Sequence, residues 1–149
     1  MKETNVTIIS TNLSKKIAKL YKDYYLVEDD FEYEDLLKHK KIIFFNVLNN
    51  LKEEEINKLY DFLKTNNILF INLTNDIELT LYTEYLIVYD DEKILIEGKT
   101  MDVLKNEKLL KRLGFDLPFM IDLSTLLSNY GIVSNIYLDK ESLRSEIWK

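Results

Sequence analysis

Five short apolar runs, separated by polar segments, organise the first part of the chain. They cover residues 6–10, 24–27, 42–45, 68–73 and 85–89. Apolar and polar positions hardly alternate within these runs, which is typical of strands buried on both faces of a parallel sheet. A polar turn, DDEK, leads from the last run to residues 94–97, and this pairing predicts a β-hairpin.

The segments between the runs have the periodicity of amphipathic helices. In the first segment four apolar residues recur at helical spacing, namely Leu13, Ile17, Leu20 and Tyr21. A later segment, LKEEEINKLYDFLKTNN, begins with an acidic turn. We therefore expect a helix that is capped by Asn50 and ends at Asn66-Asn67.

Strands that alternate with helices predict an α/β fold with a mostly parallel sheet and helices on both faces. A short helix is expected before the strand at residues 85–89. From Thr100 onward the sequence predicts helices only, broken near Gly114 and Pro118. Residues 1–99 are thus expected to form an α/β core and residues 100–149 a helical C-terminal extension, together one domain.

Composition narrows the chemistry of the chain. No cysteine is present, so disulfides and thiolate metal sites are excluded, and the single histidine, His39, excludes a multi-histidine metal site. With lysines on both sides, His39 is expected to be a solvated loop residue. The formal net charge is −6 with no long basic stripe, so nucleic acid is not an expected partner. No apolar segment is long enough to span a bilayer and the start of the chain does not resemble a signal peptide, so a cytoplasmic protein without membrane insertion is expected.

The ends of the predicted strands are where an α/β protein meets its ligands. The strand at residues 42–45 ends at Asn46 and Val47, without a carboxylate. The run LVEDD, at residues 26–30, invites comparison with the acidic pocket of receiver domains. That comparison fails because the next strand end offers an amide in place of the aspartate that would be phosphorylated.

Lys15 and Lys16 are candidate phosphate-binding residues, because they follow the first strand and stand at the start of a predicted helix. Against this, the loop at residues 10–16 has no glycine and does not fit G-x-x-x-x-G-K-[ST]. The chain has only three glycines, Gly98, Gly114 and Gly131. A glycine-rich phosphate loop is therefore excluded from the first two thirds of the chain.

The sequence from residue 41 onward resembles the ATP-binding subunits of ABC transporters, in particular the energy-coupling factor group that takes up cobalt and vitamins. In that family a hydrophobic strand enters D-E-P-T, a later strand ends in I-T-H-D, and a strand–turn–strand follows. Here the corresponding segments are IIFFNVLNNLK, NLTND and YLIVYDDEKILIEGKTMDVL. The closest likeness is in the tail, where this chain has EKLLKRLGFDLPFMIDLSTLLSNYG followed by IYLDKESLRSEIWK.

The resemblance also implies which family positions have changed. The magnesium-orienting Asp falls on Asn46, the water-activating Glu on Val47 and the dimer-contacting Asp near Lys52. The γ-phosphate-sensing His falls on Asn75, while Asp76 is kept. No L-S-G-G-Q sequence is present, and the segment before residue 42 is too short for the helical subdomain that carries it.

These departures imply a reduced ATPase-like core that does not hydrolyse ATP, with no metal and no cofactor. The expected role is that of an interaction or regulatory module, a dimer or a partner of a transporter ATPase or membrane subunit, through which it would associate with the membrane. In the family the tail lies between ATPase subunits, so it implies a candidate interface with five apolar residues, Leu117, Phe119, Met120, Leu123 and Leu127. The alternative is that this apolar face packs on the chain's own sheet.

Two further alternatives stay open at this stage. The chain could bind a nucleotide or phosphate without turnover, through Lys15 and Lys16, with Asn46 and Asn75 across the strand ends. An active hydrolase built on residues 28–30 has little support, because no base, nucleophile and orienting group can be placed together.

Overall fold

The computed structural model describes residues 5–148. The chain forms two compact units, residues 1–105 and residues 106–149. The first unit contains a six-stranded sheet in the order β2-β3-β4-β1-β5-β6. Its strands are β1 (Val6–Ile9), β2 (Tyr25–Val27), β3 (Lys41–Phe45), β4 (Leu69–Thr74), β5 (Tyr85–Asp90) and β6 (Lys93–Lys99).

The first five strands pair in parallel, and β6 alone runs antiparallel to β5. β4 lies between β3 and β1, so that Ile71 is level with Val6 on one side and with Ile43 on the other. The predicted α/β class, the mostly parallel sheet and the hairpin at β5–β6 are thereby confirmed.

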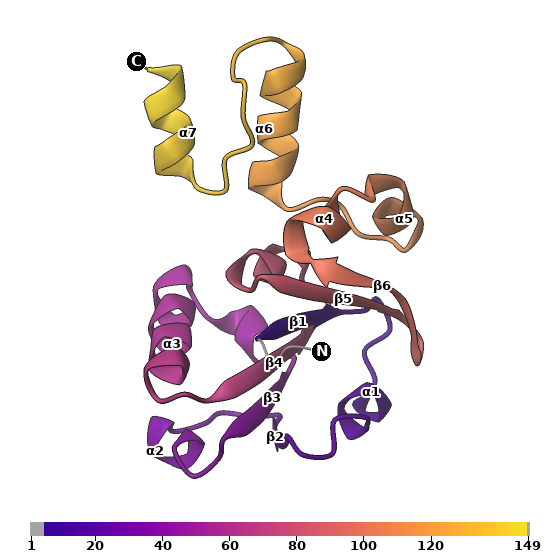
Figure 1. The fold of residues 1–149 in the computed structure, drawn as a ribbon, viewed down its shortest axis with the longest axis vertical. Helices are drawn as coiled ribbons and strands as arrows, with labels where there is room; N and C mark the ends of the chain where they lie inside the picture. Colours follow the sequence, from indigo (N-terminus) through magenta and orange to yellow (C-terminus); the bar gives the residue numbers. More distant parts are fainter. Residues whose placement is uncertain (1–4, 149) are drawn as a thin grey trace. The chain divides into compact units, whose positions relative to one another are not determined.

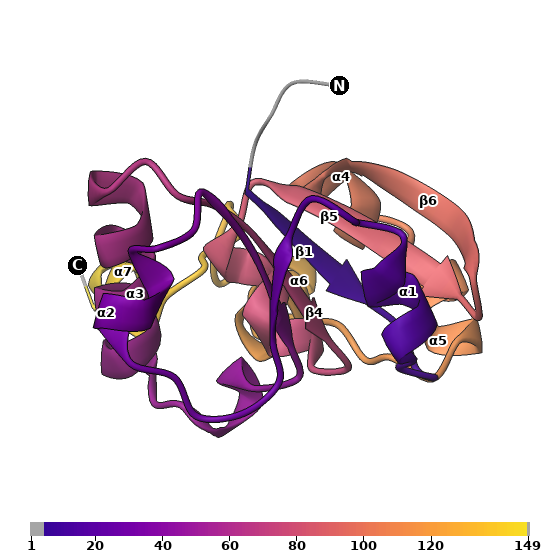
Figure 2. The same cartoon turned by 90° about the horizontal axis from the view of Figure 1, so that it is seen from below.

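Helices cover both faces of this sheet, as Figures 1 and 2 show. On one face lies α1 (Lys15–Lys19), whose Ile17 and Ala18 pack against side chains of β1, β3 and β4. On the other lie α2 (Tyr33–Leu36) and α3 (Glu53–Thr65), which bury a cluster around Phe44 and Phe70. Apolar and polar residues do not alternate within these strands because each face of the sheet packs against its own apolar layer.

Two helix predictions need correction. α1 has only five residues and ends before Leu20, whose side chain is 58% exposed, so the predicted apolar face is shorter than its spacing indicated. Asn50 does not cap α3, because Leu48–Asn50 forms a 3-10 turn, η1, that buries Leu48. The helix begins after Lys52, whose backbone N–H donates to the Glu55 carboxylate at 3.2 Å.

The end of α3 is as expected and also positions the next strand. Asn67 adopts a left-handed φ of 55°, and its N–H donates to the Lys64 carbonyl while the Ile68 N–H donates to the Leu63 carbonyl. These are the two hydrogen bonds of a Schellman motif. Leu63 and Ile68 are both buried in the same cluster, so the helix end is joined to the core immediately before β4.

After β4 a 3-10 helix, η2 (Ile77–Tyr82), leads to β5, and α4 (Thr100–Leu104) packs against β5 and β6. The second unit contains α5 (Glu107–Arg112), α6 (Phe119–Asn129) and α7 (Lys140–Ile147). A small core holds α6 and α7 together, built from Met120, Val133 and Leu143 with Leu123, Leu127 and Tyr137. None of the helices in residues 5–148 has the length and apolar character that a membrane span needs.

His39 is less exposed than the solvated loop residue that the sequence predicted. It is half-buried, and its ring stacks on that of Tyr25 with centroids 3.7 Å apart and planes within 6°. β2 and β3 enter the sheet side by side, which brings the two rings together from segments apart in the sequence.

A polar pair lies inside the α3 side of the core. The Tyr60 hydroxyl and both side-chain atoms of Asn72 are buried without a well-formed hydrogen bond to another described group. Burial raises the pKa of Tyr60, against a smaller opposing effect of the nearby Asn72 side chain. A buried hydroxyl in this position is held in its neutral form.

This burial predicts that the protein loses stability at alkaline pH through Tyr60. Above about pH 10 the unfolded tyrosine releases its proton while the folded one keeps it, so the free energy of unfolding falls by up to about 1.4 kcal/mol per pH unit. Tyr60→Phe should remove this contribution and at pH 7 stay within about 1 kcal/mol of the parent. Urea unfolding between pH 8 and pH 11 measures both quantities. Tyr130→Phe, at a residue 75% exposed, is the matched control, and an unchanged slope in Tyr60→Phe would contradict the assignment.

Candidate functional site

The carboxyl ends of β1, β3 and β4 meet at one edge of the sheet, because the three strands are neighbours and parallel. Two backbone hydrogen bonds hold their ends level. The Asn46 N–H donates to the Leu73 carbonyl at 2.8 Å, and the Ser10 N–H donates to the Thr74 carbonyl at 3.3 Å. The structure therefore brings the loops after these strands together, as the sequence predicted for a site.

Asn46 and Val47 lie where β3 leaves the sheet. Asn46 is exposed and has a left-handed φ of 54°, a conformation that asparagine tolerates better than most residues. Val47 is half-buried and packs against the α3-side cluster. The end of β3 thus offers an amide and an apolar side chain, which can form a turn but cannot donate or accept a proton at neutral pH.

Asn49 joins the loop after β3 to the loop after β4. The Thr74 hydroxyl donates to Asn49 Oδ1 at 2.5 Å, and Asn49 Nδ2 donates to Asn75 Oδ1 at 3.0 Å. The Thr74 hydroxyl also accepts the Asp76 N–H at 3.0 Å. Asn49 therefore bridges Thr74 and Asn75 through the two ends of its amide. Sequence reasoning missed Asn49, since no pattern marks which of three nearby asparagines would reach the next strand end.

Asp76 and Lys52 serve local structure at this edge. The Asp76 carboxylate accepts the N–H of Glu78 at 3.0 Å and so caps η2. Lys52 is exposed and occupies the N-cap position of α3. Each of these two residues therefore has a structural role at the start of a helix.

Lys15 and Lys16 are each engaged by a glutamate. Lys15 Nζ lies 2.9 Å from Glu28 Oε1, and this partner raises the pKa of Lys15. Lys16 Nζ lies 3.5 Å from Glu92 Oε1. Both ammonium groups point to carboxylates at the surface, and such exposed pairs contribute little to stability.

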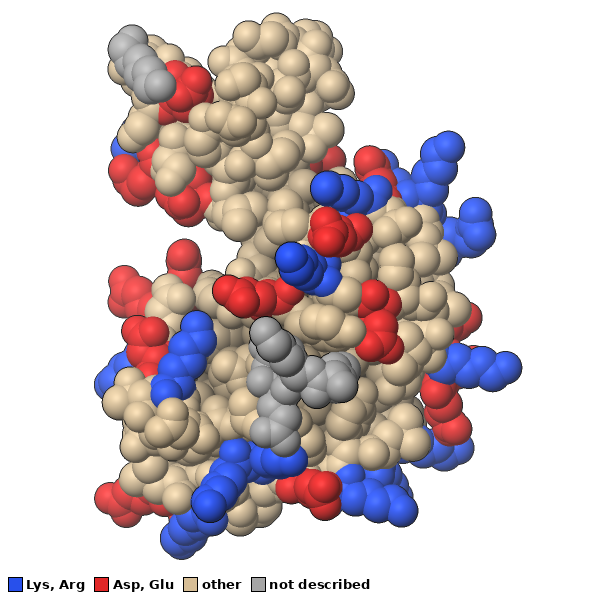
Figure 3. All heavy atoms as spheres, in the orientation of Figure 1, with Lys and Arg blue, Asp and Glu red and all other residues tan. Residues whose placement is uncertain are grey.

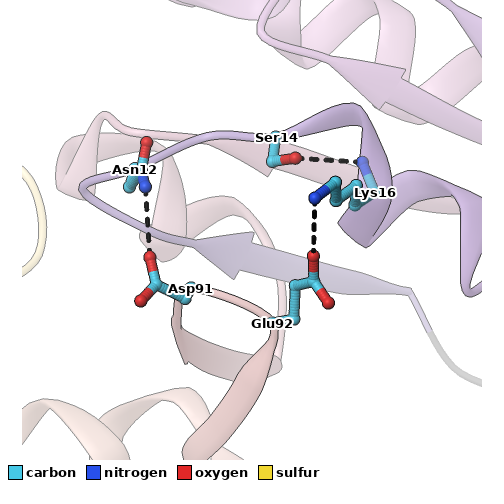
Figure 4. Close-up of polar contacts among 5 residues, drawn as sticks. All are labelled: Asn12, Ser14, Lys16, Asp91 and Glu92. Atoms are coloured by element: carbon cyan, nitrogen blue, oxygen red, sulfur yellow. Dashed lines mark hydrogen bonds and ion pairs between the residues drawn. The ribbon is translucent and has the colours of Figure 1, made fainter.

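The turn between β5 and β6 faces the loop after β1 (Figure 4). Asn12 Nδ2 donates to Asp91 Oδ1 at 3.1 Å beside the Lys16–Glu92 pair. The Ser14 hydroxyl accepts the Lys16 N–H at 3.1 Å and caps α1. The first helix start is therefore already capped and faced by two carboxylates, which disfavours a phosphate there.

A pocket of about 650 Å³ opens beside Asn46 and Val47. Carboxylates of the loop after β2 line it, from Glu28 to Asp30 and at Glu32, with Glu55 of α3 opposite. Its negative wall repels phosphates. Among the residues that the structure describes, no group of three or more His, Cys, Asp or Glu side chains is arranged to hold a metal ion.

The five candidate interface residues have different surroundings in the second unit. Met120, Leu123 and Leu127 belong to the small core between α6 and α7, and Leu117 is buried. Phe119 is 58% exposed. Other large apolar side chains of this unit are exposed as well, and sequence spacing did not single them out: Leu126, Tyr130, Ile132, Ile136, Leu138, Ile147 and Trp148.

The chain has distant, partial similarity to the ATP-binding proteins of energy-coupling factor transporters. It is 31% identical over 99 residues to the energy-coupling factor transporter ATP-binding protein EcfA1 of Lactobacillus delbrueckii subsp. bulgaricus, a match that covers 66% of this chain and 35% of that protein. The EcfA1 protein of Bacillus subtilis is 30% identical over 105 residues, or 69% of this chain and 37% of its own. The matched region thus spans about a third of the length of these curated relatives.

Comparisons with family models and with solved structures give less similarity. No family model matches the sequence. A solved structure of cbiO1 from Clostridium perfringens, described as part of the ABC transporter complex cbiONQ, matches 50% of this chain and 32% of its own, with 19% identity and a TM-score of 0.40.

The bridge made by Asn49 gives a stability prediction. Asn49→Ala leaves the fully buried Thr74 hydroxyl without its acceptor, so the free energy of unfolding should fall by about 1–3 kcal/mol. Asn50→Ala, at the exposed neighbour in η1, should change it by less than about 0.5 kcal/mol. Urea denaturation at pH 7 compares the two, and equal losses would show that the bridge does not hold the loops together.

Proposed function

We propose that this chain is a non-catalytic relative of the energy-coupling factor ATP-binding proteins and acts as an interaction module. It pairs with a second copy of itself or with an ATP-binding subunit of such a transporter. The observation that carries the proposal is the carboxyl end of β3, where Asn46 and Val47 occupy the positions that the resemblance assigns to two catalytic acids.

ATP hydrolysis needs a metal, a water-positioning group and a cradle for the phosphates. An asparagine and a valine supply neither a metal-binding carboxylate nor a general base, and loss of a base alone costs about two to four decades in rate. At the end of β1, the loop has no glycine, and Ser14 and two carboxylates occupy the surroundings of the helix start. The chain therefore departs from the requirements of hydrolysis in three respects: the metal, the water-positioning group and the phosphate cradle.

Pairing is supported by the surface of the second unit. Several aromatic and aliphatic side chains of this unit are exposed, among them Phe119, Tyr130, Ile132 and Trp148. Aromatic residues are enriched in protein interfaces. Met120, Leu123 and Leu127, by contrast, stabilise the unit itself and are less suited to contact a partner.

Sedimentation velocity tests the pairing. The purified chain, alone from 1 to 500 μM and mixed with a purified energy-coupling factor ATP-binding protein, is expected to form a complex. Phe119→Ser together with Leu126→Ser should weaken that complex at least about tenfold, as loss of buried anchors does at interfaces.

The matched control is Leu95→Ser, which removes an apolar side chain of similar exposure from β6 in the first unit. A chain that stays monomeric at every concentration and has no affinity for the transporter protein contradicts the proposal. An equal loss of affinity in the Leu95 variant contradicts the assignment of the surface.

A further inference from the structure

We propose that the amino-terminal edge of β2 and β3 docks onto an anionic lipid bilayer. The surface, called the basic edge below, consists of Lys22, Lys38, Lys40 and Lys41 with Tyr25, Leu37 and His39. It lies within the first unit and is independent of the proposed pairing through the second.

Parallel pairing assembles the basic edge. Tyr25 at the start of β2 is level with Ile42 in β3, so the segments that enter these strands lie at the same edge of the sheet. Residues from Asp23 to Tyr25 and from Lys38 to Lys41 line a common shallow pocket there. Figure 3 shows lysine side chains gathered over the lower part of the first unit, where β2 and α2 lie in Figure 1.

Positive charge dominates this edge although the chain has a net charge of −6. Lys22, Lys38 and Lys40 are exposed, and Asp23 is the one carboxylate in the two entering segments. Lys38 also pairs with Asp35 at 3.3 Å, a surface contact that contributes little. Lys64 adds a further positive charge in the last turn of α3, which ends at this edge, where the Leu69 N–H donates to the Lys40 carbonyl.

The opposite edge has more carboxylates than lysines, although Lys15, Lys16, Lys52 and Lys93 also lie there and the first two pair with Glu28 and Glu92. Residues 28–30 follow β2, Asp76 and Glu78 follow β4, and residues 90–92 close the β5–β6 hairpin. Charge is therefore separated along the strand direction. An anionic surface attracts the amino-terminal edge and repels the carboxyl-terminal edge, so the unit approaches in one orientation.

The composition of the basic edge favours lipid over nucleic acid or a protein. It contains lysines and no arginine. The ammonium group of lysine is a point charge, whereas the planar guanidinium of arginine recognises phosphates and bases by two hydrogen bonds at once. Leu37 is 53% exposed and Tyr25 is 44% exposed, beside those lysines. Lysine stems with an exposed leucine and tyrosine match the boundary between lipid headgroups and acyl chains, where amphipathic side chains concentrate.

Vesicle co-sedimentation of the full chain tests the proposal. Vesicles that contain one third phosphatidylglycerol should bind it, vesicles of pure phosphatidylcholine should not, and binding should weaken as salt screens the charges. Each lysine near an anionic bilayer contributes roughly fivefold to partitioning, so Lys22→Gln with Lys40→Gln should reduce it about 25-fold. Leu37→Ser should reduce it less, by about threefold to tenfold.

The control pair, Lys93→Gln with Lys99→Gln, makes the same change in net charge on the exposed positions of β6. It should bind like the parent, and an unchanged melting temperature in each variant shows that the fold is kept. Equal loss in the control pair, equal binding to neutral vesicles, or lysine-dependent binding of an RNA oligomer without binding of vesicles would each overturn the proposal.

Discussion

The first unit depends on the position of β4 between β3 and β1. This strand is buried on both faces, with apolar residues from the α3 side packed against Phe44 and those from the α1 side packed against Ile8. Parallel pairing on both of its sides places the loops after β1, β3 and β4 at one edge and the segments that enter the strands at the other. The candidate site is a consequence of this arrangement, and the parallel pairing of β2 with β3 continues the entering edge into the basic edge.

At the carboxyl edge several polar side chains bond to other groups of the same unit. Asn49 bonds to both Thr74 and Asn75, Asp76 and Ser14 cap helices, and the two lysines near the start of α1 face glutamates. The hydrogen bonds stabilise the loops that they join, while the exposed lysine–glutamate pairs contribute little. These groups make their polar contacts within the fold, which favours a structural role for them over phosphate binding.

Sequence patterns were sufficient to predict the strands, because a strand buried on both faces needs an unbroken apolar run and that requirement is local. Helix starts were harder. Asn50 has the chemistry of a cap, but it lies in the 3-10 turn that buries Leu48, and α3 begins at Glu53 with Lys52 as its N-cap. The partners of Lys16 and Asn12 could not be predicted either, since they lie on the β5–β6 turn, which the pairing of β1 with β5 brings to the loop after β1.

The C-terminal tail illustrates a related limit. Its apolar spacing predicted a buried face, and Met120, Leu123 and Leu127 do form one, but spacing cannot say whether that face meets a partner or a helix of the same unit. In the same way, the sequence shows Lys38, Lys40 and Lys41 as one short run, and only the parallel pairing of β2 and β3 places the segment with Lys22 at the same edge.

Calorimetric titration of Mg-ATP into the purified chain, at protein concentrations that detect millimolar affinity, tests the central claim most directly. No saturable heat, no rise in melting temperature and no release of phosphate are the results that a non-catalytic interaction module predicts. Saturable binding that is lost on replacing Lys15 and Lys16 by alanine would contradict it and would indicate a chain that senses a nucleotide.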